Sequence, residues 1–590
     1  MSADTHAPTP PFYLTTAIDY VNAAPHLGHA YEKVAADVVA RFHRLLGQPV
    51  FFLTGTDEHG IKVEKTALQK GLAPKAYTDT MAPAFQTTWD LLGIVPDRFI
   101  RTTDADHYQV VAHLWNTLKA KGDIYKAAYT GNYCSGCETF LTERDLNERG
   151  ECRIHLKTPE AVQEENYFFK LSAYRDAIRT HIEQNPNFIL PAFRAQEVLQ
   201  LLDEIEDISV SRSRQAVSWG IPVPDDDDQV IYVWIDALSN YLTGVGYQTN
   251  AALYERFWPA NLHIIGKDIL RFHAIYWPAM LLSANIPLPK TVFAHGFINL
   301  NDAKISKSIG NVVAPQDVMA RFSLTTPDPI RYYLMSVTTF GQDGNFTEDD
   351  FKARINADLA NNLGNLVNRS LNMTVKYFEG KVPTLPTAPE LLYQNDTAYL
   401  HQLTQEFDAL SAEEKNPWKD GYHFPTDPGG MPYLNSALRQ HPHYLPSRLW
   451  DQFVDDVRFK YACYDFEFAL FTTFTHLVSP VNLFIDQMAP WSLAKAGDTD
   501  ALAHVLYSVL ERIRQLAILL CPVIPSLSCN ILCQLGYAAE NRSGQLWINA
   551  QPVTWNHLYA PLPYSQTLQP TGPLLPRLDS ELAGTAKKGT

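Results

Sequence analysis

The sequence predicts an α/β fold in which a parallel sheet is interrupted by an insertion and followed by an all-helical region. Three observations support this prediction. Buried strand-like runs alternate with helical periods over roughly the first hundred residues. The alternation returns near residue 226 after a cysteine-containing segment, and from about residue 346 the periodicity is helical. Alternating strands and helices are typical of a parallel sheet with helices on its faces.

Two apolar runs, at residues 12–18 and 49–56, predict the first buried strands. Between them, Val34, Val38, Phe42 and Leu45 recur at three- and four-residue steps. This spacing predicts an amphipathic helix from about Leu27 to Leu46. Further helical periods lie near residues 60–70, 74–93 and 105–121.

The segment 124–225 breaks the alternation and ends near an acidic loop, PVPDDDDQ. Strands at 262–266 and 291–298, with a helix from about 269 to 284 between them, then resume it. We therefore expect one Rossmann-like sheet that is split by an insertion.

The rest of the chain is expected to be mainly helical. Thr347 and Asp350 have the spacing of a capping box at a helix start. The Pro-, Tyr- and His-rich stretch 382–450 reads as an irregular insertion, and the Pro-rich tail is expected to be loosely ordered. The predicted division is 1–123 for the first half of the sheet, 124–225 for its insertion, 226–300 for the second half, 301–356 for the following loop region, 357–560 for the helical region and 561–590 for the tail.

Composition restricts the class of protein. The net charge of −16 disfavours a general nucleic-acid coat, although a local contact is compatible with it. There is no run of eighteen apolar residues, and the N-terminus has neither a basic nor an apolar targeting segment. Seven cysteines do not form a paired framework. We expect a cytoplasmic protein in a reducing compartment.

The sequence HLGH opens the first predicted helix. A helix N-terminus offers unbonded N–H groups and the positive end of the helix dipole, which together bind anions. His26 and His29 share one face and can donate to phosphate oxygens, while Gly28 lets another group approach the backbone. The alternative is a packed, hydrogen-bonded histidine pair.

The sequence AKISKS follows the last predicted strand and contains Lys304 and Lys307. Lysine is a mobile point charge that suits phosphate groups. Most surface lysines are merely solvated, so this motif gains weight only beside HLGH.

The sequence GTDEHG ends the second strand at the edge where α/β sheets bind ligands. A carboxylate there could hold an ammonium group, and Asp57 is the candidate. The alternative is a helix N-cap for the following helix.

Two segments, YVWIDALSNY and IIGKDILRFHAIYWPAML, concentrate aromatic side chains. Such stripes more often form core than a ligand pocket. Aromatic walls nevertheless suit a flexible thioether, because sulfur–aromatic contacts are favourable.

A CxxC pair and a CxxH pair lie in the predicted insertion. Cys134, Cys137, Cys152 and His155 form a closed tetrahedral donor set of the kind that holds structural Zn²⁺. Two coincidental pairs are the alternative. The remaining cysteines, Cys463, Cys521, Cys529 and Cys533, lie in apolar helical sequence and are expected in the core.

Two motifs bracket the split sheet: HxGH at the first strand–helix turn and KxSKS after the last strand. With this pair of motifs the chain resembles the class I aminoacyl-tRNA synthetases. TGTDEHG, YVWIDALSNYLTGVGY, IIGKDILRFHAIYWPAML and AHGFINLNDAKISKSIGN narrow the resemblance to the bacterial-type methionyl-tRNA synthetase family. It covers about residues 12–380 and 455–500. It implies a methionine–tRNA ligase for protein synthesis that uses Mg²⁺-ATP, one structural Zn²⁺ in a connective insertion, and a helical anticodon-binding domain.

The resemblance also implies roles for single residues. The ATP site would comprise His26, Gly28, His29, Lys267, Asp268, Lys304 and Lys307, of which His26, His29, Lys304 and Lys307 stabilise the reacting phosphates. The methionine pocket would comprise Ala17, Ile18, Asp57, Trp234, Tyr241, Phe272, His273 and Trp277, with Arg212 organising the site. Asn365, Arg369 and Trp491 would read the CAU anticodon of tRNA(Met), for which a surface helix and a core Pro-Trp loop are the alternative.

Three rival functions stay open at this point. A cysteine-activating class I relative fits less well, because the aromatic pocket is roomy for a small thiol. A small nucleotidyltransferase with HxGH would leave the helical region unexplained. An inactive RNA-binding relative is disfavoured by the intact histidines and lysines. The chain lacks the oligonucleotide-binding domain that dimerises many relatives of this family, so a monomer is expected.

Overall fold

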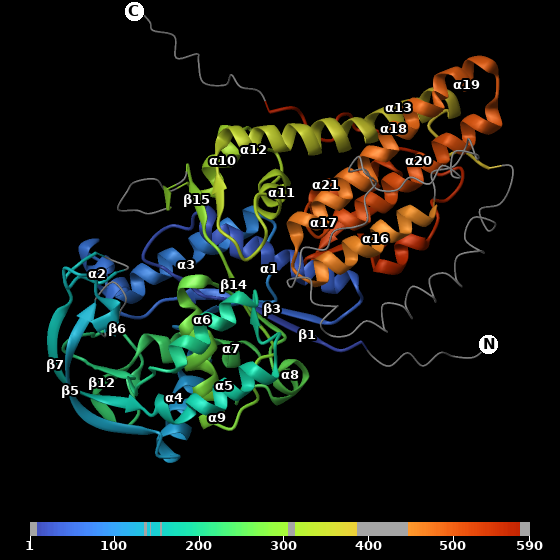
Figure 1. Ribbon diagram of the computed structural model, residues 1–590. Helices are drawn as coiled ribbons and strands as arrows, with labels where there is room; N and C mark the ends of the chain where they lie inside the picture. Colours follow the sequence, from blue (N-terminus) through green and yellow to red (C-terminus); the bar gives the residue numbers. More distant parts are fainter. Residues whose placement is uncertain are drawn as a thin grey trace, which may run out of the picture. The chain divides into compact units, whose positions relative to one another are not determined.

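The computed structural model describes residues 9–134, 139–141, 143–153, 156–301, 303–304, 313–385 and 447–578. The chain forms two compact units. The first comprises the chain up to Ala40, Gln48–Phe297 and Val312–Pro315. The second comprises Arg41–Gly47, Ile298–Asn311 and the chain from Gln316 onward. Figure 1 labels their elements.

A seven-stranded parallel sheet forms the centre of the first unit. Its neighbouring strands include β3 (Val50–Asp57), β1 (Phe12–Thr16), β13 (Leu262–Gly266), β14 (Val292–His295) and β8 (Ile189–Leu190), in that order. Two further strands, β2 (Asp19–Tyr20) and β4 (Arg98–Arg101), pair with β3. Leu14 lies opposite Leu262, and Phe12 lies opposite Val50. Because helices cover both faces, the strands are near-continuous apolar runs, and the predicted parallel sheet is confirmed.

The helices of this unit confirm the periodicity-based predictions to within two residues at each end. They are α1 (Leu27–Leu45), α2 (Ile61–Gln69), α3 (Pro74–Leu91) and α4 (Ala105–Ala120). On one face of the sheet, α4, α7 (Val233–Gly244) and α9 (Trp277–Ser283) share an apolar core with β1, β3 and β4 (Figure 1).

The single helix expected over residues 269–284 is wrong in its detail. The chain forms a 3₁₀ turn at Lys267–Ile269, then a π-helical turn at Phe272–Tyr276, then α9. π-helical turns inside helices are frequent at functional sites. Phe272 and His273 lie in this turn.

The segment predicted as an insertion forms an antiparallel sheet with the order β6 (Thr139–Leu141), β5 (Ile124–Cys134), β7 (Glu160–Phe169) and β9 (Ile208–Ser209). Figure 1 shows β5 and β7 as long, curved strands. The segment also contains α5 (Arg175–Gln184) and α6 (Phe193–Leu202). Its strand β8 pairs with β14, so the segment also supplies an edge strand of the parallel sheet.

The second unit is mainly helical, as predicted. Thr347 caps α12 (Glu348–Arg354), because its hydroxyl accepts from the Asp350 N–H at 3.1 Å. The remaining helices accompany the long, buried α20 (Thr499–Leu520) in this unit. They include α11 (Asp328–Ser336), α13 (Gly364–Phe378), α16 (Ser447–Ala462), α17 (Phe466–Thr472), α18 (Ser479–Met488), α19 (Pro490–Ala496) and α21 (Pro525–Gln534).

The expectation of a loosely ordered tail is wrong up to residue 578. Leu562, Leu568, Leu574, Leu575 and Leu578 are all buried. The Tyr507 hydroxyl donates to the Leu562 carbonyl at 3.0 Å, and the Asn356 amide donates to the Leu578 carbonyl at 2.9 Å. Leucines between the prolines therefore attach this segment to the helices. Most of the predicted insertion at 382–450 lies outside the described residues.

One helical stretch in the described part of the chain, Phe466–Ala496, is long and apolar enough to cross a membrane. Just over half of its most apolar window, 56%, is buried inside the structure. Core helices satisfy the same length and composition test, so the finding is weak evidence for a membrane segment.

Candidate active site

His26 and His29 stand at the start of α1, where the sequence predicts an anion site. The His26 Nδ1 accepts from the Gly28 N–H at 3.1 Å, and the His29 Nδ1 accepts from the His26 N–H at 3.2 Å. The ring centroids are 3.9 Å apart. Since each Nδ1 is an acceptor, each neutral ring carries its hydrogen on Nε2. The pair is therefore organised as two Nε2–H donors beside a helix N-terminus.

Gly28 is required by this arrangement. A Cβ at this position would lie 2.9 Å from His26 Cε1 and 3.0 Å from its Nδ1. Any other residue would therefore displace the His26 ring. Gly28 thus serves the packing of the histidine as well as the approach of a ligand.

Lys267 and Asp268 follow β13, the strand next to β1. The carboxyl ends of neighbouring parallel strands meet at one edge of the sheet, so these residues share an edge with the start of α1. The Lys267 ammonium lies 4.8 Å from the centre of the Phe297 ring. The side chain of Asp268 is exposed. This edge therefore presents a cation and a carboxylate beside the histidine pair.

A buried charge network, which the sequence analysis missed, begins one turn after His29. The Lys33 ammonium contacts the Ala17 carbonyl at 2.9 Å, Asp19 at 2.8 Å and Glu32 at 2.6 Å. The second Glu32 oxygen lies 3.0 Å from His295 Nε2. Burial raises the pKa of Asp19 to about 7, whereas Lys33 and His295 outweigh burial and lower the pKa of Glu32. Charged residues on an otherwise apolar helix were the available signal.

The candidate methionine pocket has stacked aromatic walls. The Trp234 and Phe272 rings are parallel, with centroids 3.7 Å apart. The His273 Nδ1 lies 3.0 Å from the Ile269 carbonyl, so it is the donor, and the Nε2 accepts from the Tyr241 hydroxyl at 2.7 Å. Trp277 is fully buried. The structure therefore brings these predicted residues together.

His263 is a further member of this wall that the sequence analysis missed. Its ring stacks on Tyr241 with centroids 4.3 Å apart, and its Nε2 accepts from the Trp277 indole N–H at 3.3 Å. Its Nδ1 lies 2.6 Å from the Thr15 hydroxyl. Burial lowers the pKa of His263 well below its ordinary value and lowers that of His273 to about 4. The wall is therefore uncharged at neutral pH, as an apolar side chain requires.

These neutral histidines predict an acid-sensitive fold. Between pH 6.5 and about 4, the unfolded chain binds a proton at His273 that the folded chain excludes. The contribution of His273 to the unfolding free energy therefore falls by up to about 3 kcal/mol as the pH drops through this window. We expect the melting temperature of His273→Gln to fall less between pH 6.5 and 4.5 than that of the wild type. His113→Gln, which replaces an exposed imidazole, should keep the wild-type dependence; an equal slope for His273→Gln would contradict the neutral wall.

Asp57 ends β3 at the same edge of the sheet and is buried. The alternative assignment of GTDEHG as a helix cap is wrong, since the residue before α2 is Gly60 and no side chain caps that helix. Gly60 has a φ of 99°, in the region that favours glycine. Its N–H donates to the Trp219 carbonyl at 3.1 Å. The turn after β3 is therefore held by Gly60 and its bond to Trp219, and not by a side-chain cap of α2.

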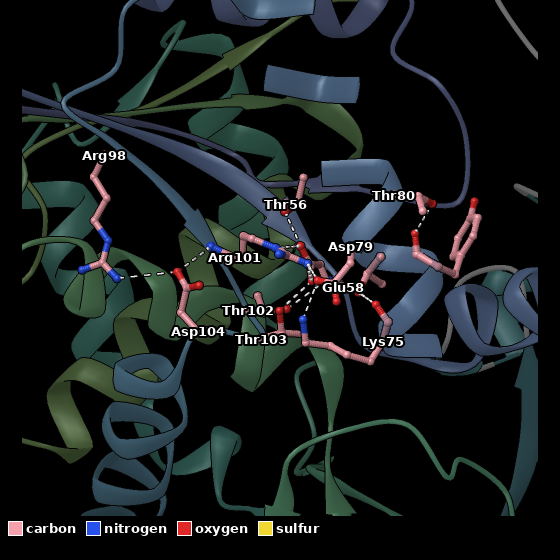
Figure 2. Close-up of polar contacts among 12 residues, drawn as sticks. Thr56, Glu58, Lys75, Asp79, Thr80, Arg98, Arg101, Thr102, Thr103 and Asp104 are labelled. Atoms are coloured by element: carbon pink, nitrogen blue, oxygen red, sulfur yellow. Dashed lines mark hydrogen bonds and ion pairs between the residues drawn. The ribbon is translucent and has the colours of Figure 1, made fainter. Parts of the chain in front are cut away.

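Glu58 anchors this turn to the neighbouring strand β4, as Figure 2 shows. Its fully buried carboxylate accepts from the Arg101 guanidinium at 2.6 and 2.8 Å. The Thr56 and Thr103 hydroxyls also donate to it, at 2.8 and 2.7 Å. Arg101 continues outward to Asp79 at 2.7 Å. Every oxygen of Glu58 is therefore satisfied, and the residue after Asp57 is fixed.

Arg212, predicted to organise the site, is buried on β10 (Ser211–Ser213). Its guanidinium donates to the Ser211 carbonyl at 2.7 Å and the Ser209 hydroxyl at 2.9 Å, and lies 4.5 Å from the Tyr232 ring centre. Arg214 is exposed and binds the Asp227 carbonyl. Burial and bonding therefore distinguish the two arginines and favour Arg212 for a positioning role.

The other predicted residues fall in three places. Lys304 lies in β16 (Ala303–Lys304) of the second unit, and Lys307 lies outside the described residues. On α13, Asn365 is exposed and Arg369 pairs with Asp486 of α18 at 2.6 Å. Trp491 on α19 is 46% exposed, so the alternative of a core Pro-Trp loop is wrong.

Two members of the predicted zinc set lie together. Cys134, at the end of β5, and Cys152 are buried and share a small apolar cluster with Leu141 and Leu146. Cys137 and His155 lie outside the described residues. The described residues contain no group of three metal ligands. Two buried thiols in one small cluster fit the donor chemistry of Zn²⁺.

Comparisons with known proteins agree with this geometry. The family model of class I tRNA synthetases (M) matches residues 12–154 and 145–371. A methionine–tRNA ligase of Thermosynechococcus vestitus is 42% identical over 536 residues, which cover 90% of this chain and 91% of the relative. That of Thermotoga maritima is 40% identical and covers 89% and 75%. The methionyl-tRNA synthetase of Mycobacterium tuberculosis, solved with methionyl-adenylate, gives a TM-score of 0.80 at 37% identity and covers 96% of this chain and 100% of that one.

Proposed function

Because the chain belongs to the methionine–tRNA ligases of the class I tRNA synthetase family, we propose that its sheet edge activates methionine through the residues described above. The activity is ATP-dependent ligation of methionine to tRNA, for protein synthesis. The observation that supports the site assignment is the convergence at one sheet edge of the histidine donors, the buried Asp57 and the neutral aromatic wall.

In the first step, a methionine carboxylate oxygen attacks the α-phosphorus of ATP. A bond forms between that oxygen and phosphorus, the bond to the bridging oxygen of the β-phosphate breaks, and pyrophosphate leaves with the electron pair. Mg²⁺ accompanies ATP as the counterion of its phosphates. The protein positions the reactants and stabilises the developing charge, and no covalent enzyme intermediate is needed. His26 and His29 donate from Nε2, and Lys304, Lys307 and Lys267 supply positive charge.

In the second step, a hydroxyl of the terminal adenosine of the tRNA attacks the acyl carbon of methionyl-adenylate. The new ester bond forms while the bond between the acyl carbon and the phosphate oxygen breaks, AMP leaves with the electron pair, and the hydroxyl proton passes to a phosphate oxygen of AMP. The donors that stabilise the first transition state also face the leaving phosphate in this step. Both steps thus use one set of fixed donors.

The methionine pocket has a charged end and an apolar end. Asp57 accepts the ammonium group, while Ala17, Ile18 and the aromatic wall enclose the thioether. The wall consists of the predicted residues Trp234, Tyr241, Phe272, His273 and Trp277, together with His263. An apolar pocket discriminates by about 1–3 kcal/mol per methylene, so shape must supply the selectivity.

We assign anticodon recognition to Asn365, Arg369 and Trp491 of the second unit. An exposed indole can stack on an unpaired base, and alanine substitution at such contacts removes about 1–3 kcal/mol. Trp491→Ala is expected to lower kcat/KM for tRNA(Met) aminoacylation about 5- to 150-fold and to leave ATP–pyrophosphate exchange unchanged. Phe471→Ala, which removes another exposed aromatic ring, is the matched control and should change neither rate. Equal effects of the two variants would contradict this assignment.

We assign a structural Zn²⁺ to Cys134, Cys137, Cys152 and His155, where it would close the loop between β5 and β7 and leave no open position for substrate. Purified protein is expected to contain one zinc per chain by elemental analysis, and Cys152→Ser is expected to lose it. Cys463→Ser, at a helix end in the second unit, is the matched control and should keep the metal. A zinc-free wild type with full activity would contradict the site.

A further inference from the structure

Asp236 is a buried carboxylate to which the mechanism above assigns no role. It lies on α7 and is 1% exposed. One oxygen lies 2.7 Å from His59 Nδ1, and the other lies 2.7 Å from His107 Nε2. His59 and His107 belong to two other elements, the turn after β3 and the helix α4. A single carboxylate therefore joins three elements.

The outer nitrogens of both histidines are also bonded. His59 Nε2 lies 2.9 Å from the Tyr108 hydroxyl, and His107 Nδ1 lies 2.9 Å from the Thr243 hydroxyl. A buried charge is unfavourable unless every partner is satisfied, and apolar side chains could pack these elements without that penalty. A fully satisfied buried network fixes one geometry. The cluster therefore fixes the distances and orientations of the turn after β3, α4 and α7 relative to one another, which apolar packing alone does not.

The cluster spans the two ends of the methionine pocket. His59 follows Asp57, the proposed ammonium acceptor, by two residues. Asp236 follows Trp234 by two residues and precedes Tyr241 on the same helix. The other anchor of the turn, Glu58 with Arg101, holds it to β4 (Figure 2). His59 therefore bonds the turn that carries Asp57 directly to α7, the helix that carries Trp234 and Tyr241 of the aromatic wall.

We propose that Asp236 is a specificity-determining positioning residue, whose paired bonds with His59 and His107 set the separation between Asp57 and the aromatic wall. The length of the bound side chain is then measured against this fixed separation. The proposal rests on the methionine pocket proposed above. Asp236 touches no substrate and acts through the positions of Asp57, Trp234 and Tyr241.

The test compares amino acids that differ in length. Methionine, homocysteine, which lacks the terminal methyl, and ethionine, which carries one more methylene, drive ATP–pyrophosphate exchange by wild type and Asp236→Asn. Asparagine keeps the shape but offers one acceptor and one donor in place of two acceptors. We expect the variant to raise the KM for methionine more than it lowers kcat. We also expect the kcat/KM ratio of methionine to ethionine to fall at least about fivefold, from a wild-type ratio on the order of 10 to 200 per methylene.

Asp328→Asn is the matched control. Asp328 is fully buried in the second unit, and its carboxylate accepts from the Leu527 N–H at 2.6 Å. Both variants should lose thermal stability, but Asp328→Asn should keep the wild-type substrate ratios. A uniform loss for all three amino acids in Asp236→Asn, with unchanged ratios, would show a merely structural role and overturn the proposal.

Two further variants keep the outcome decisive. If Asp236→Asn does not fold, His107→Gln breaks the same cluster from α4 and should shift the ratios in the same direction. The double variant His107→Gln/Asp236→Asn should match the stronger single variant, because bonds that act as a unit are not additive. Asp57→Asn, assayed beside them, distinguishes a wrong pocket assignment from a wrong role for Asp236. An unchanged methionine KM in Asp57→Asn would refute the proposed methionine pocket. A raised methionine KM in Asp57→Asn, with unchanged substrate ratios in Asp236→Asn, would refute only the positioning role of Asp236.

Discussion

Asp57→Asn is expected to raise the KM for methionine about 150- to 5000-fold in ATP–pyrophosphate exchange. The substitution removes the charge opposite the ammonium group in a buried site, where loss of one ion-pair partner typically removes about 3–5 kcal/mol. That range corresponds to about two to nearly four orders of magnitude in affinity. The KM for ATP should change less than about threefold, because Asp57 faces the amino acid in this arrangement.

The control for this variant is Asp97→Asn. Asp97 lies just before β4 and accepts from the Phe52 N–H at 2.8 Å, away from the edge that carries Asp57. The Asp97→Asn substitution removes a carboxylate next to the same sheet and should leave the methionine KM near the wild-type value. A methionine KM that is equally high in both variants would indicate general damage to the sheet rather than loss of an ammonium site.

His26→Ala and His29→Ala are each expected to lower the rate of adenylate formation about 100- to 1000-fold. Removing one fixed donor to a developing negative charge has effects of this size. Methionine binding without ATP, measured by equilibrium titration, should remain within about twofold, because the imidazoles face the phosphates. His43→Ala, at the other end of the same helix, is the control and should keep the wild-type rate. Full exchange activity in either variant would show that the substituted histidine does not stabilise the reacting phosphates.

Much of the fold was predictable because it depends on local patterns. The helix at Leu27–Leu45 and the strand at Leu262–Gly266 follow from apolar spacing alone. The π-helical turn at Phe272–Tyr276 does not, because a five-residue hydrogen-bond step leaves a sequence pattern indistinguishable from an ordinary helix. The tail was misjudged because proline content outweighed the leucines that bury it.

The candidate site residues could be named from the sequence where one short segment contains them. HLGH, TDEHG and the aromatic segments fall into this class. The network around Lys33 was missed because Lys33 meets Asp19, and Glu32 meets His295, only in the folded protein. His263 was missed because a histidine inside an apolar strand reads as core. The roles of Glu58 and Asp236 likewise depend on contacts between distant segments.

Amino-acid-dependent ATP–pyrophosphate exchange by the purified full chain is the most direct test of methionine activation at this sheet edge. Methionine, cysteine, leucine and valine are compared in parallel, with His26→Ala beside the wild type. We expect methionine to support exchange far better than the other three amino acids, and His26→Ala to lose this exchange activity. Exchange driven best by another amino acid would contradict the pocket, and no exchange with any of them from folded protein would contradict the activation chemistry itself.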